Sequence, residues 1–317
     1  MQASDYSFIQ YHGQSAGSTL HGNLVGLWTA IEAETGGRVS ASVHAENGKV
    51  AGGDPTALRM LIAGEIQFYT LMGGIIGTVV PVAEVQQVPF AFASAAQAHN
   101  AIDGPLGRML ADEMAAKGMH LFPHGGFDNG MRQVASVTRA VATPDDLAGM
   151  RIRVPPGQLI FDTFQAFGAE PVIIPAYQLY DGLATGQVAA QENPLAVLEG
   201  FKLYELVKYV SMTNHMWSGF NLMAHLPTWQ RLPDDIRSVI ARNVVKHVRQ
   251  QRADQSALNA ALRQDLARQD LERRGLAFNE VDQAAFRARL AGVYAAWRQR
   301  LGQRCWSLLE AEVGRLG

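Results

Sequence analysis

Four segments of one central stretch decide the fold: TPDDLAGMRIRVPP (143–156), FQAFGAEPVIIPAYQLYDGLATG (164–186), QENP (191–194) and YELVKYVSMTNH (204–215). The first opens with a helix-start signal, because Thr143 suits an N-cap, proline follows at the first helical position and two aspartates occupy the first turn. Short apolar runs at 152–154 and 172–174 then alternate with helical patterns at 159–167 and 177–185, and a glycine follows each helical pattern. Strand and helix in alternation predict an α/β unit with a mostly parallel sheet.

The same alternation occupies the N-terminal part of the chain. Strands are predicted at 7–11, 39–43, 66–71 and 120–124, and helices at 17–35 and 55–63. From Pro233 onward the pattern is almost wholly helical, with one run to about residue 274 that exceeds ordinary helix length. No linker rich in Pro, Gly and Ser separates the two α/β parts, so strands and helices are expected to join them.

These patterns predict an α/β fold of two lobes with mixed, mostly parallel sheets. Lobe I is expected to take residues 1–125, completed by about 214–250, and lobe II residues 126–213. The long helices of 233–317 are expected to brace both lobes. A hinge made of strands suits closure of two lobes around a ligand.

Composition and charge narrow the class of protein. Of 317 residues, 48% are hydrophobic and 18% are charged, as in a folded chain rather than a disordered one. The formal net charge of -2 argues against nucleic acid as a partner, because that partner needs a clustered basic face. The arginine-rich part, 231–304, mixes basic, acidic and amide residues at helical spacing, which is typical of a solvated helix surface. The single cysteine, Cys305, excludes an intrachain disulfide and is expected in the core.

No segment is expected to span a membrane. The longest apolar run, 71–83, is too short, and three glycines and a proline interrupt it. The first residues, MQASDYSFIQYHG, have neither the basic n-region nor the apolar h-region of a signal peptide.

Familiar catalytic motifs are absent from the sequence. It contains no G-x-S-x-G, P-loop, H-E-x-x-H or dinucleotide fingerprint, so neither an enzyme nor a cofactor is predicted. His12, His124 and His215 fall near the ends of predicted elements, and for His215 packing or hydrogen bonding is the default role.

The four central segments, in this order, closely resemble the second domain of the solute-binding proteins of tripartite ATP-independent periplasmic (TRAP) transporters, the DctP-like family. The resemblance extends to SAGSTLHGNLVGLWTAIEAETGGRV (15–39), GDPTALRMLIAGEIQF (53–68), VPFAF (88–92) and WQRLPDDIRSVIARNVVKHVRQQRADQ (229–255), and so covers nearly the whole chain. It implies the two-lobed periplasmic binding protein fold, with an interlobe strand hinge and long C-terminal helices. It also implies a monomeric protein exported to the periplasm, whose signal peptide is absent from this sequence.

The resemblance further implies partners for the chain. A ligand-loaded member docks on a small and a large membrane subunit, which use an ion gradient for transport. A sensor that presents its ligand to a receptor is the alternative in the same class, and an enzyme acting on a small carboxylate is the alternative outside it.

Three residues match the family's carboxylate clamp. Arg153 occupies the IRVP motif, whose arginine grips the substrate carboxylate in the family, and a guanidinium fork matches a carboxylate as lysine cannot. Arg132, in GMRQ, matches the family's other site arginine, with a structural salt bridge as the alternative role. Asn193, in QENP, matches an amide that bonds the same acid group. Arg151 is expected to be a surface charge or a support for its neighbours.

The sequence departs from the family pattern at several positions. Ala189 and Ala190 stand before QENP where Asp-Gly is usual, and Gln178 replaces a common glutamate. The glutamate, tryptophan and glutamine set with which some members hold a metal is not recognisable, so no metal is predicted.

The other ligand contacts are expected from lobe I and from aromatic side chains. The expected residues are His12, Asp54, Met72, Gly73, Gly74, Ile75, Pro155 and Gly157, with Phe127, Tyr177, Trp217 and Phe220 as an aromatic wall or, alternatively, as core. A polyol against Met72 and Ile75 would lose hydrogen bonds to water without replacement. The predicted ligand is therefore a compact 2-oxo or 2-hydroxy acid, aromatic or branched, or else a small aliphatic acid.

Overall fold

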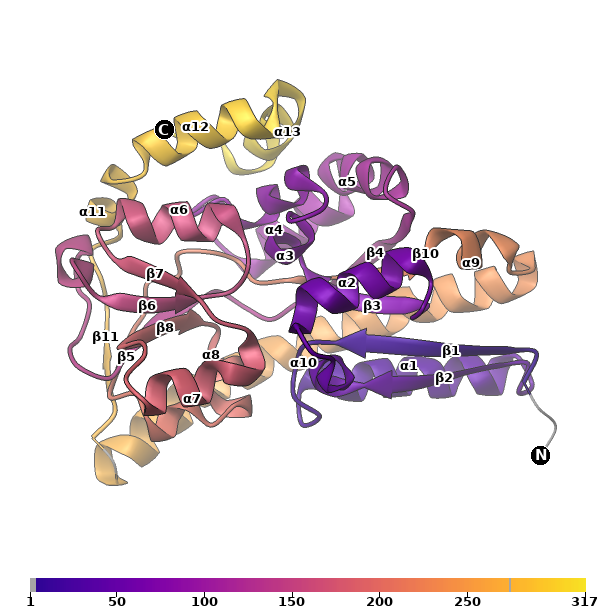
Figure 1. Cartoon of the computed structure of the whole chain (residues 1–317), viewed down its shortest axis with the longest axis horizontal. Helices are drawn as coiled ribbons and strands as arrows, with labels where there is room; N and C mark the ends of the chain where they lie inside the picture. Colours follow the sequence, from indigo (N-terminus) through magenta and orange to yellow (C-terminus); the bar gives the residue numbers. More distant parts are fainter. Residues whose placement is uncertain (1–3, 274) are drawn as a thin grey trace.

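The computed structural model describes residues 4–273 and 275–317, and it contains two β-sheets flanked by helices (Figure 1). Five of the nine strand pairs in these residues are parallel and four are antiparallel. Both sheets are therefore mixed, and the predicted α/β class is confirmed.

The first sheet has five strands in the order β2-β1-β3-β10-β4. They are β1 (Tyr6–His12), β2 (Val39–His44), β3 (Phe68–Met72), β4 (Met119–Phe127) and β10 (Phe220–His225). β1 is parallel to both of its neighbours, whereas β10 runs antiparallel to β3 and β4. The helices of this lobe are α1 (Thr19–Glu34), η1 (Ala45–Lys49), α2 (Gly53–Ala63), α3 (Gly73–Ile76), η2 (Pro81–Gln87), α4 (Ala95–Asp103) and α5 (Pro105–Ala115).

The second sheet has six strands in the order β11-β9-β5-β8-β6-β7. They are β5 (Gln133–Ser136), β6 (Arg151–Val154), β7 (Glu170–Ile173), β8 (Ala190–Asn193), β9 (Tyr209–Ser211) and β11 (Ala277–Asn279). Its shorter helices are η3 (Pro144–Leu147), α6 (Gln158–Ala166), η4 (Ala176–Gln178), α7 (Leu179–Ala184), α8 (Leu195–Gly200) and η5 (Leu203–Glu205).

Two extended segments connect the sheets, one after β4 and one before β10. They pair with each other through an antiparallel bridge between Met131 and Trp217 and through the amide of Arg132, which donates to the carbonyl of Met216 at 2.8 Å. Asp128 reinforces this crossing, because its Oδ1 accepts from the indole Nε1 of Trp217 at 2.9 Å. The paired segments form a strand hinge between the two lobes.

The C-terminal part adds α9 (Leu226–Arg231), α10 (Asp234–Arg273), α11 (Gln283–Ala288), α12 (Ala291–Leu301) and α13 (Gln303–Val313). Figure 1 shows α10 in orange running along both sheets. It is 40 residues long and contacts α1 and β4 in the first lobe and α8 and β11 in the second. Such a helix spans about 60 Å.

Three local details differ from or add to the expectations. The part after Pro233 is almost wholly helical, as predicted, but it also contains β11, which pairs in parallel with β9 and adds a strand to the second sheet. A strand of three residues is too short for its periodicity to be visible in the sequence. The predicted helix at 177–185 begins as the separate 3-10 turn η4, and the strand predicted at 66–71 is β3, which begins and ends later, at Phe68 and Met72.

Candidate functional site

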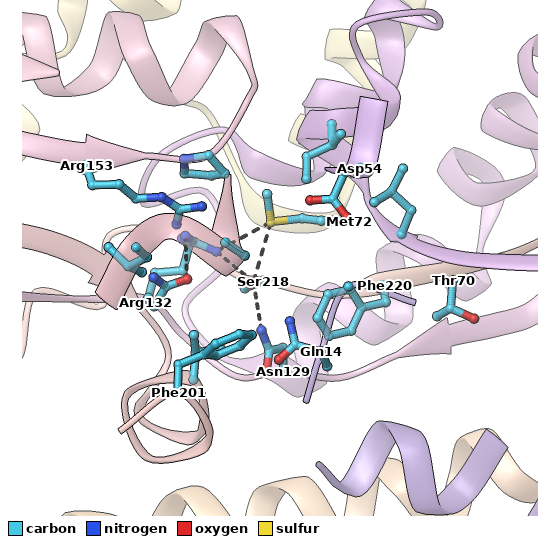
Figure 2. A pocket seen from close by; sticks show the side chains of 18 residues that line it. Gln14, Asp54, Thr70, Met72, Asn129, Arg132, Arg153, Phe201, Ser218 and Phe220 are labelled. Carbon is cyan, nitrogen blue, oxygen red and sulfur yellow. Dashed lines mark hydrogen bonds between the residues drawn. The ribbon is translucent and has the colours of Figure 1, made fainter. Parts of the chain in front are cut away.

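A cavity between the lobes gathers most of the predicted site residues. Its walls include Asp54, Met72, Ile75, Arg132, Arg153, Pro155, Asn193 and Phe220, together with Asn129, Phe201 and Ser218, which the sequence did not single out. Figure 2 shows the two arginines entering from the side of the second lobe, and Asp54 and Thr70 lying on the side of the first. The cavity volume is about 50 Å³, which is room for a few water molecules.

Arg153 lies near the end of β6, with only 3% of its surface exposed. Its Nε donates to the carbonyl oxygen of Ile174 at 2.7 Å, while among the described residues its two terminal nitrogens have no hydrogen-bond or ion-pair partner. Burial lowers the pKa of Arg153 to about 10, with Glu192 and Asp54 acting in the opposite direction and Arg132 in the same direction. The guanidinium therefore stays charged at neutral pH. It is a buried cation with two uncommitted donor groups facing a cavity.

Arg132 lies beside it but is bound internally. Its Nε and Nη2 grip both carboxylate oxygens of Glu192, and the Nη2 to Oε1 distance is 2.6 Å. Nη2 also donates to the Asn193 amide oxygen at 3.0 Å, and Nη1 donates to the Ser218 hydroxyl at 2.9 Å. The charge of Arg132 is therefore matched within the protein, whereas Arg153 has no ion-pair partner among the residues that the structure describes.

Glu192 binds Arg132 in this wall, and the sequence analysis did not single it out. It is fully buried in β8, and the Nε2 of His215 lies 3.1 Å from its Oε2. Burial raises the pKa of Glu192, but the charge and hydrogen bonds of Arg132 and His215 outweigh burial and hold this pKa below its usual value. The sequence feature that could have identified Glu192 is the QENP motif, because an acid inside a buried strand needs a cation as its partner.

Asn193 is placed in the cavity wall by the same network. Its Oδ1 accepts from Arg132, and its Nδ2 donates to the Gln191 Oε1 at 2.6 Å. The amide is thereby held in one orientation next to Arg132.

The first lobe contributes one acid and an apolar surface. Asp54 Oδ1 accepts from the Asn47 amide at 2.7 Å and from the Tyr69 hydroxyl at 2.9 Å, which fixes the carboxylate at the cavity edge. Burial, and then the charge of Asp54, raise the pKa of Tyr69 well above its ordinary value. Met72 and Ile75 supply the apolar part of this wall.

Several predicted contacts lie outside the cavity lining. His12 is buried, with its Nε2 2.9 Å from His21 Nδ1, and burial and then His21 lower the pKa of His12 to about 3. Gly73 packs against Gln86, Gly74 against Gln87, and Gly157 packs against the carbonyl of Gly74. All four positions serve close packing of backbone and side chains rather than the cavity surface.

The expected aromatic wall is mostly core. Phe127 is completely buried, and Trp217 stacks edge-on against Phe92 while bonding Asp128 at the hinge. Tyr177 is 47% exposed and lies against Gly53 at the outer edge. Of the predicted aromatics only Phe220 lines the cavity, because Phe127 and Trp217 pack inside the protein and Tyr177 lies at its surface.

Residues 4–273 and 275–317 contain no group of three or more His, Cys, Asp or Glu side chains placed to hold a metal ion. Over the same residues, no helix combines the length and the hydropathy that a membrane crossing needs.

Two α/β lobes joined by a strand hinge around a small charged cavity define the class of solute-binding proteins. The chain matches the model of the DctP family, described as bacterial extracellular solute-binding protein, family 7, over residues 11–300, and it belongs to that family. Family members are the solute-binding proteins of TRAP transporters, so the resemblance found in the sequence is confirmed.

Known relatives and solved structures agree with this assignment. A TRAP periplasmic solute-binding protein from Chromohalobacter salexigens, solved with bound D-glucuronate, has 25% identity and a TM-score of 0.89, over 96% of this chain and 98% of that one. The 2,3-diketo-L-gulonate-binding periplasmic protein YiaO of Escherichia coli is 36% identical over 44% of this chain and 42% of its own. An uncharacterized protein of Sinorhizobium fredii, y4mM, is 32% identical over 73% of this chain, which spans only 42% of that relative.

Proposed function

We propose that this chain is the periplasmic component of a TRAP transporter and captures a small organic acid through Arg153. The observation that carries the proposal is the buried guanidinium whose terminal nitrogens have no partner among the described residues and face the interlobe cavity. A buried cation without an acid is costly, and a bidentate carboxylate would supply both the charge and the two acceptors that it lacks. Arg132 and Asn193 would border the same acid group.

The ligands of similar proteins support an acid. D-glucuronate in the Chromohalobacter protein and 2,3-diketo-L-gulonate for YiaO are both carboxylates. A C4-dicarboxylate-binding relative from Rhodobacter capsulatus, 28% identical over 49% of this chain, adds a third carboxylate class.

We infer a compact 2-oxo or 2-hydroxy acid, with an aromatic or branched side chain preferred over a small aliphatic one. The small cavity and the apolar surface of Met72, Ile75 and Phe220 favour such a ligand. Asp54 and Thr70 on the opposite wall offer acceptors for a hydroxyl group, and Asn193 offers both a donor and an acceptor.

Capture would proceed by lobe closure. An acid binds Arg153 on the second lobe, the first lobe then covers it, and water leaves the cavity. The ligand favours closure only to the extent that it binds the closed form better than the open form. The loaded protein would deliver its ligand, as a monomer, to the small and large membrane subunits.

A thermal-shift screen tests the proposal. The panel contains lactate, pyruvate, 3-phenyllactate, phenylpyruvate, succinate and glucuronate, and the amides of lactate and phenyllactate serve as uncharged controls. At one hundred times Kd a ligand adds about 2.7 kcal/mol, which raises Tm by several degrees. Shifts confined to carboxylates are expected. No shift with any carboxylate, or a larger shift with an amide, would contradict the clamp.

A further inference from the structure

A buried contact joins the lobes away from the ligand cavity. The Oε2 of Glu84, in η2 of the first lobe, accepts a hydrogen bond from the backbone amide of Leu159 at 2.6 Å. Leu159 lies in the first turn of α6, which belongs to the second lobe, and the amide of Gln158 also faces the carboxylate. Only 3% of Glu84 is exposed.

Glu84 caps this helix from the opposite lobe. The N-cap position of α6 is Gly157, which has no side chain and makes no side-chain cap of its own. The first amides of a helix need acceptors, and a negative charge near them is favourable. In this chain the acceptor comes from a residue 75 positions earlier.

Glycines provide the space for this contact. A Cβ added to Gly77 would lie 2.2 Å from the Cγ of Glu84, and a Cβ on Gly157 would lie 3.3 Å from the carbonyl oxygen of Gly74. Gly77 has an ordinary helical backbone, so glycine is needed there for room rather than for conformation. The backbones of α3, η2 and α6 can therefore approach closely.

The contact lies a short distance along the chain from the clamp. β6 carries Arg153 and ends at Val154, and α6 begins at Gln158. Pro155, Pro156 and Gly157 stand between them, and the two prolines restrict the backbone of this short connection. A displacement of the start of α6 is thus passed to Arg153 and to Pro155, which both line the cavity.

We propose that Glu84 is a positioning residue: by capping α6 across the lobe interface, it holds the lobes together and fixes Arg153 against the wall of the first lobe. Its importance for ligand capture rests on the proposed function, but the coupling itself is measured without ligand. Arg300 of α12 and Asp162 of α6 are charged neighbours of Glu84 and are left unchanged in the variants below.

The first readout is the distance between the lobes in ligand-free protein. Spin labels are attached to cysteines introduced at the exposed residues Glu32 and Thr185, because the native Cys305 is buried. We expect the E84A variant to gain a population with a longer distance. E84Q keeps an acceptor oxygen for the Leu159 amide and should match the wild type, and G77A, which displaces Glu84, should resemble E84A. E65A, at an exposed position of the same lobe, is the matched control.

The second readout is hydrogen exchange of the Arg153 Nε proton, which is bonded to Ile174. E84A loses the hydrogen bond between Glu84 and the Leu159 amide. The stabilisation lost with one hydrogen bond predicts roughly tenfold faster exchange of the Arg153 Nε proton in E84A, and no such change in E84Q. If E84A does not fold, the comparison of E84Q with G77A still tests whether Glu84 positions α6 and Arg153.

Wild-type distances and exchange in E84A or in G77A would overturn the proposal, and so would an E84Q protein that behaves like E84A. A wild-type protein that binds no acid in the panel, but whose variants shift as expected, would overturn the clamp and leave the role of Glu84 intact.

Discussion

The Nε of Arg153 donates a hydrogen bond to the carbonyl oxygen of Ile174 at 2.7 Å, and this single contact turns the guanidinium fork toward the cavity. Arg132 lines the same cavity, but its guanidinium binds both carboxylate oxygens of Glu192. Two arginines of equal charge thus differ in their pairing: in residues 4–273 and 275–317, Arg132 forms an ion pair with Glu192 and Arg153 forms none. The following predictions rest on that difference and on other buried ionisable groups.

Replacing Arg153 with alanine should weaken binding of the acid by about thirtyfold to several thousandfold. This range corresponds to about 2 to 5 kcal/mol for a carboxylate left buried without its partner. Isothermal titration with an acid from the panel measures it. Arg151→Ala, on an exposed arginine of the same strand, is the matched control and should bind as the wild type does. An Arg153→Ala protein with wild-type affinity would refute the clamp.

Arg153→Met should make the ligand-free protein more stable while abolishing binding. Burial disfavours the charged guanidinium, as its lowered pKa of about 10 indicates, and no internal acid pairs with it among the described residues. Replacing a buried ion with an apolar side chain of similar volume is often neutral or stabilising by about 1 to 4 kcal/mol. Urea unfolding of the ligand-free proteins tests this, and a large loss of stability would show that Arg153 has a structural role.

Glu192→Gln should destabilise the protein by about 3 to 5 kcal/mol, because it leaves Arg132 buried without a counter-charge. The carboxylate of Glu192 lies between Arg132 and His215, and all three side chains are buried. Chemical denaturation provides the measurement, with Glu205→Gln on the surface as control. A cost below about 1 kcal/mol would mean that the ion pair contributes little.

Glu84 should make the protein less stable as pH rises from about 4.5 to about 7. Burial raises the pKa of Glu84 to about 7, against smaller lowering effects of the Leu159 amide and Arg300. The folded state therefore holds a proton that the unfolded state has lost, so the free energy of unfolding falls across this window, by at most about 3 kcal/mol. In Glu84→Gln this component should disappear. Unfolding curves at pH 5 and pH 8 for both proteins would reveal it, and parallel pH profiles would exclude it.

His12 should make the protein more stable as pH rises, which is opposite to the effect of Glu84. Burial and then His21 lower the pKa of His12 to about 3, so the unfolded state binds a proton first as pH falls. The stability contributed by neutral His12 is complete above about pH 6.5 and is lost as pH falls toward 3, by up to about 5 kcal/mol. His12→Asn should flatten the acid limb, whereas His124→Asn, whose side chain is 57% exposed, should not. His120, with a pKa lowered to about 4, leaves part of the acid dependence in place.

The sequence by itself determined the α/β class, the helix starts and the clamp candidates. Local signals such as the Thr143 cap and the glycine after each helical run depend only on neighbouring residues, and the structure contains the corresponding turn with Thr143 and Asp146 joined in a capping box. The IRVP and QENP motifs likewise pointed to Arg153 and Asn193, and both reach the same cavity.

Only the tertiary structure decided which charge is paired and which is free. Arg132 and Glu192 are 60 residues apart, and Glu84 and Leu159 are 75 apart, so no local pattern brings them together. The same limit explains β11, whose three residues become a strand only because β9 lies beside them. The same limit explains why Trp217 and Phe127 are buried in the core and do not line the cavity. The packing of the surrounding segment decides whether an aromatic side chain enters a core or a cavity. Pairing and burial depend on the complete three-dimensional arrangement. Within the described part of the chain, that arrangement pairs Arg132 with Glu192 and leaves Arg153, in the same cavity wall, without an ion-pair partner.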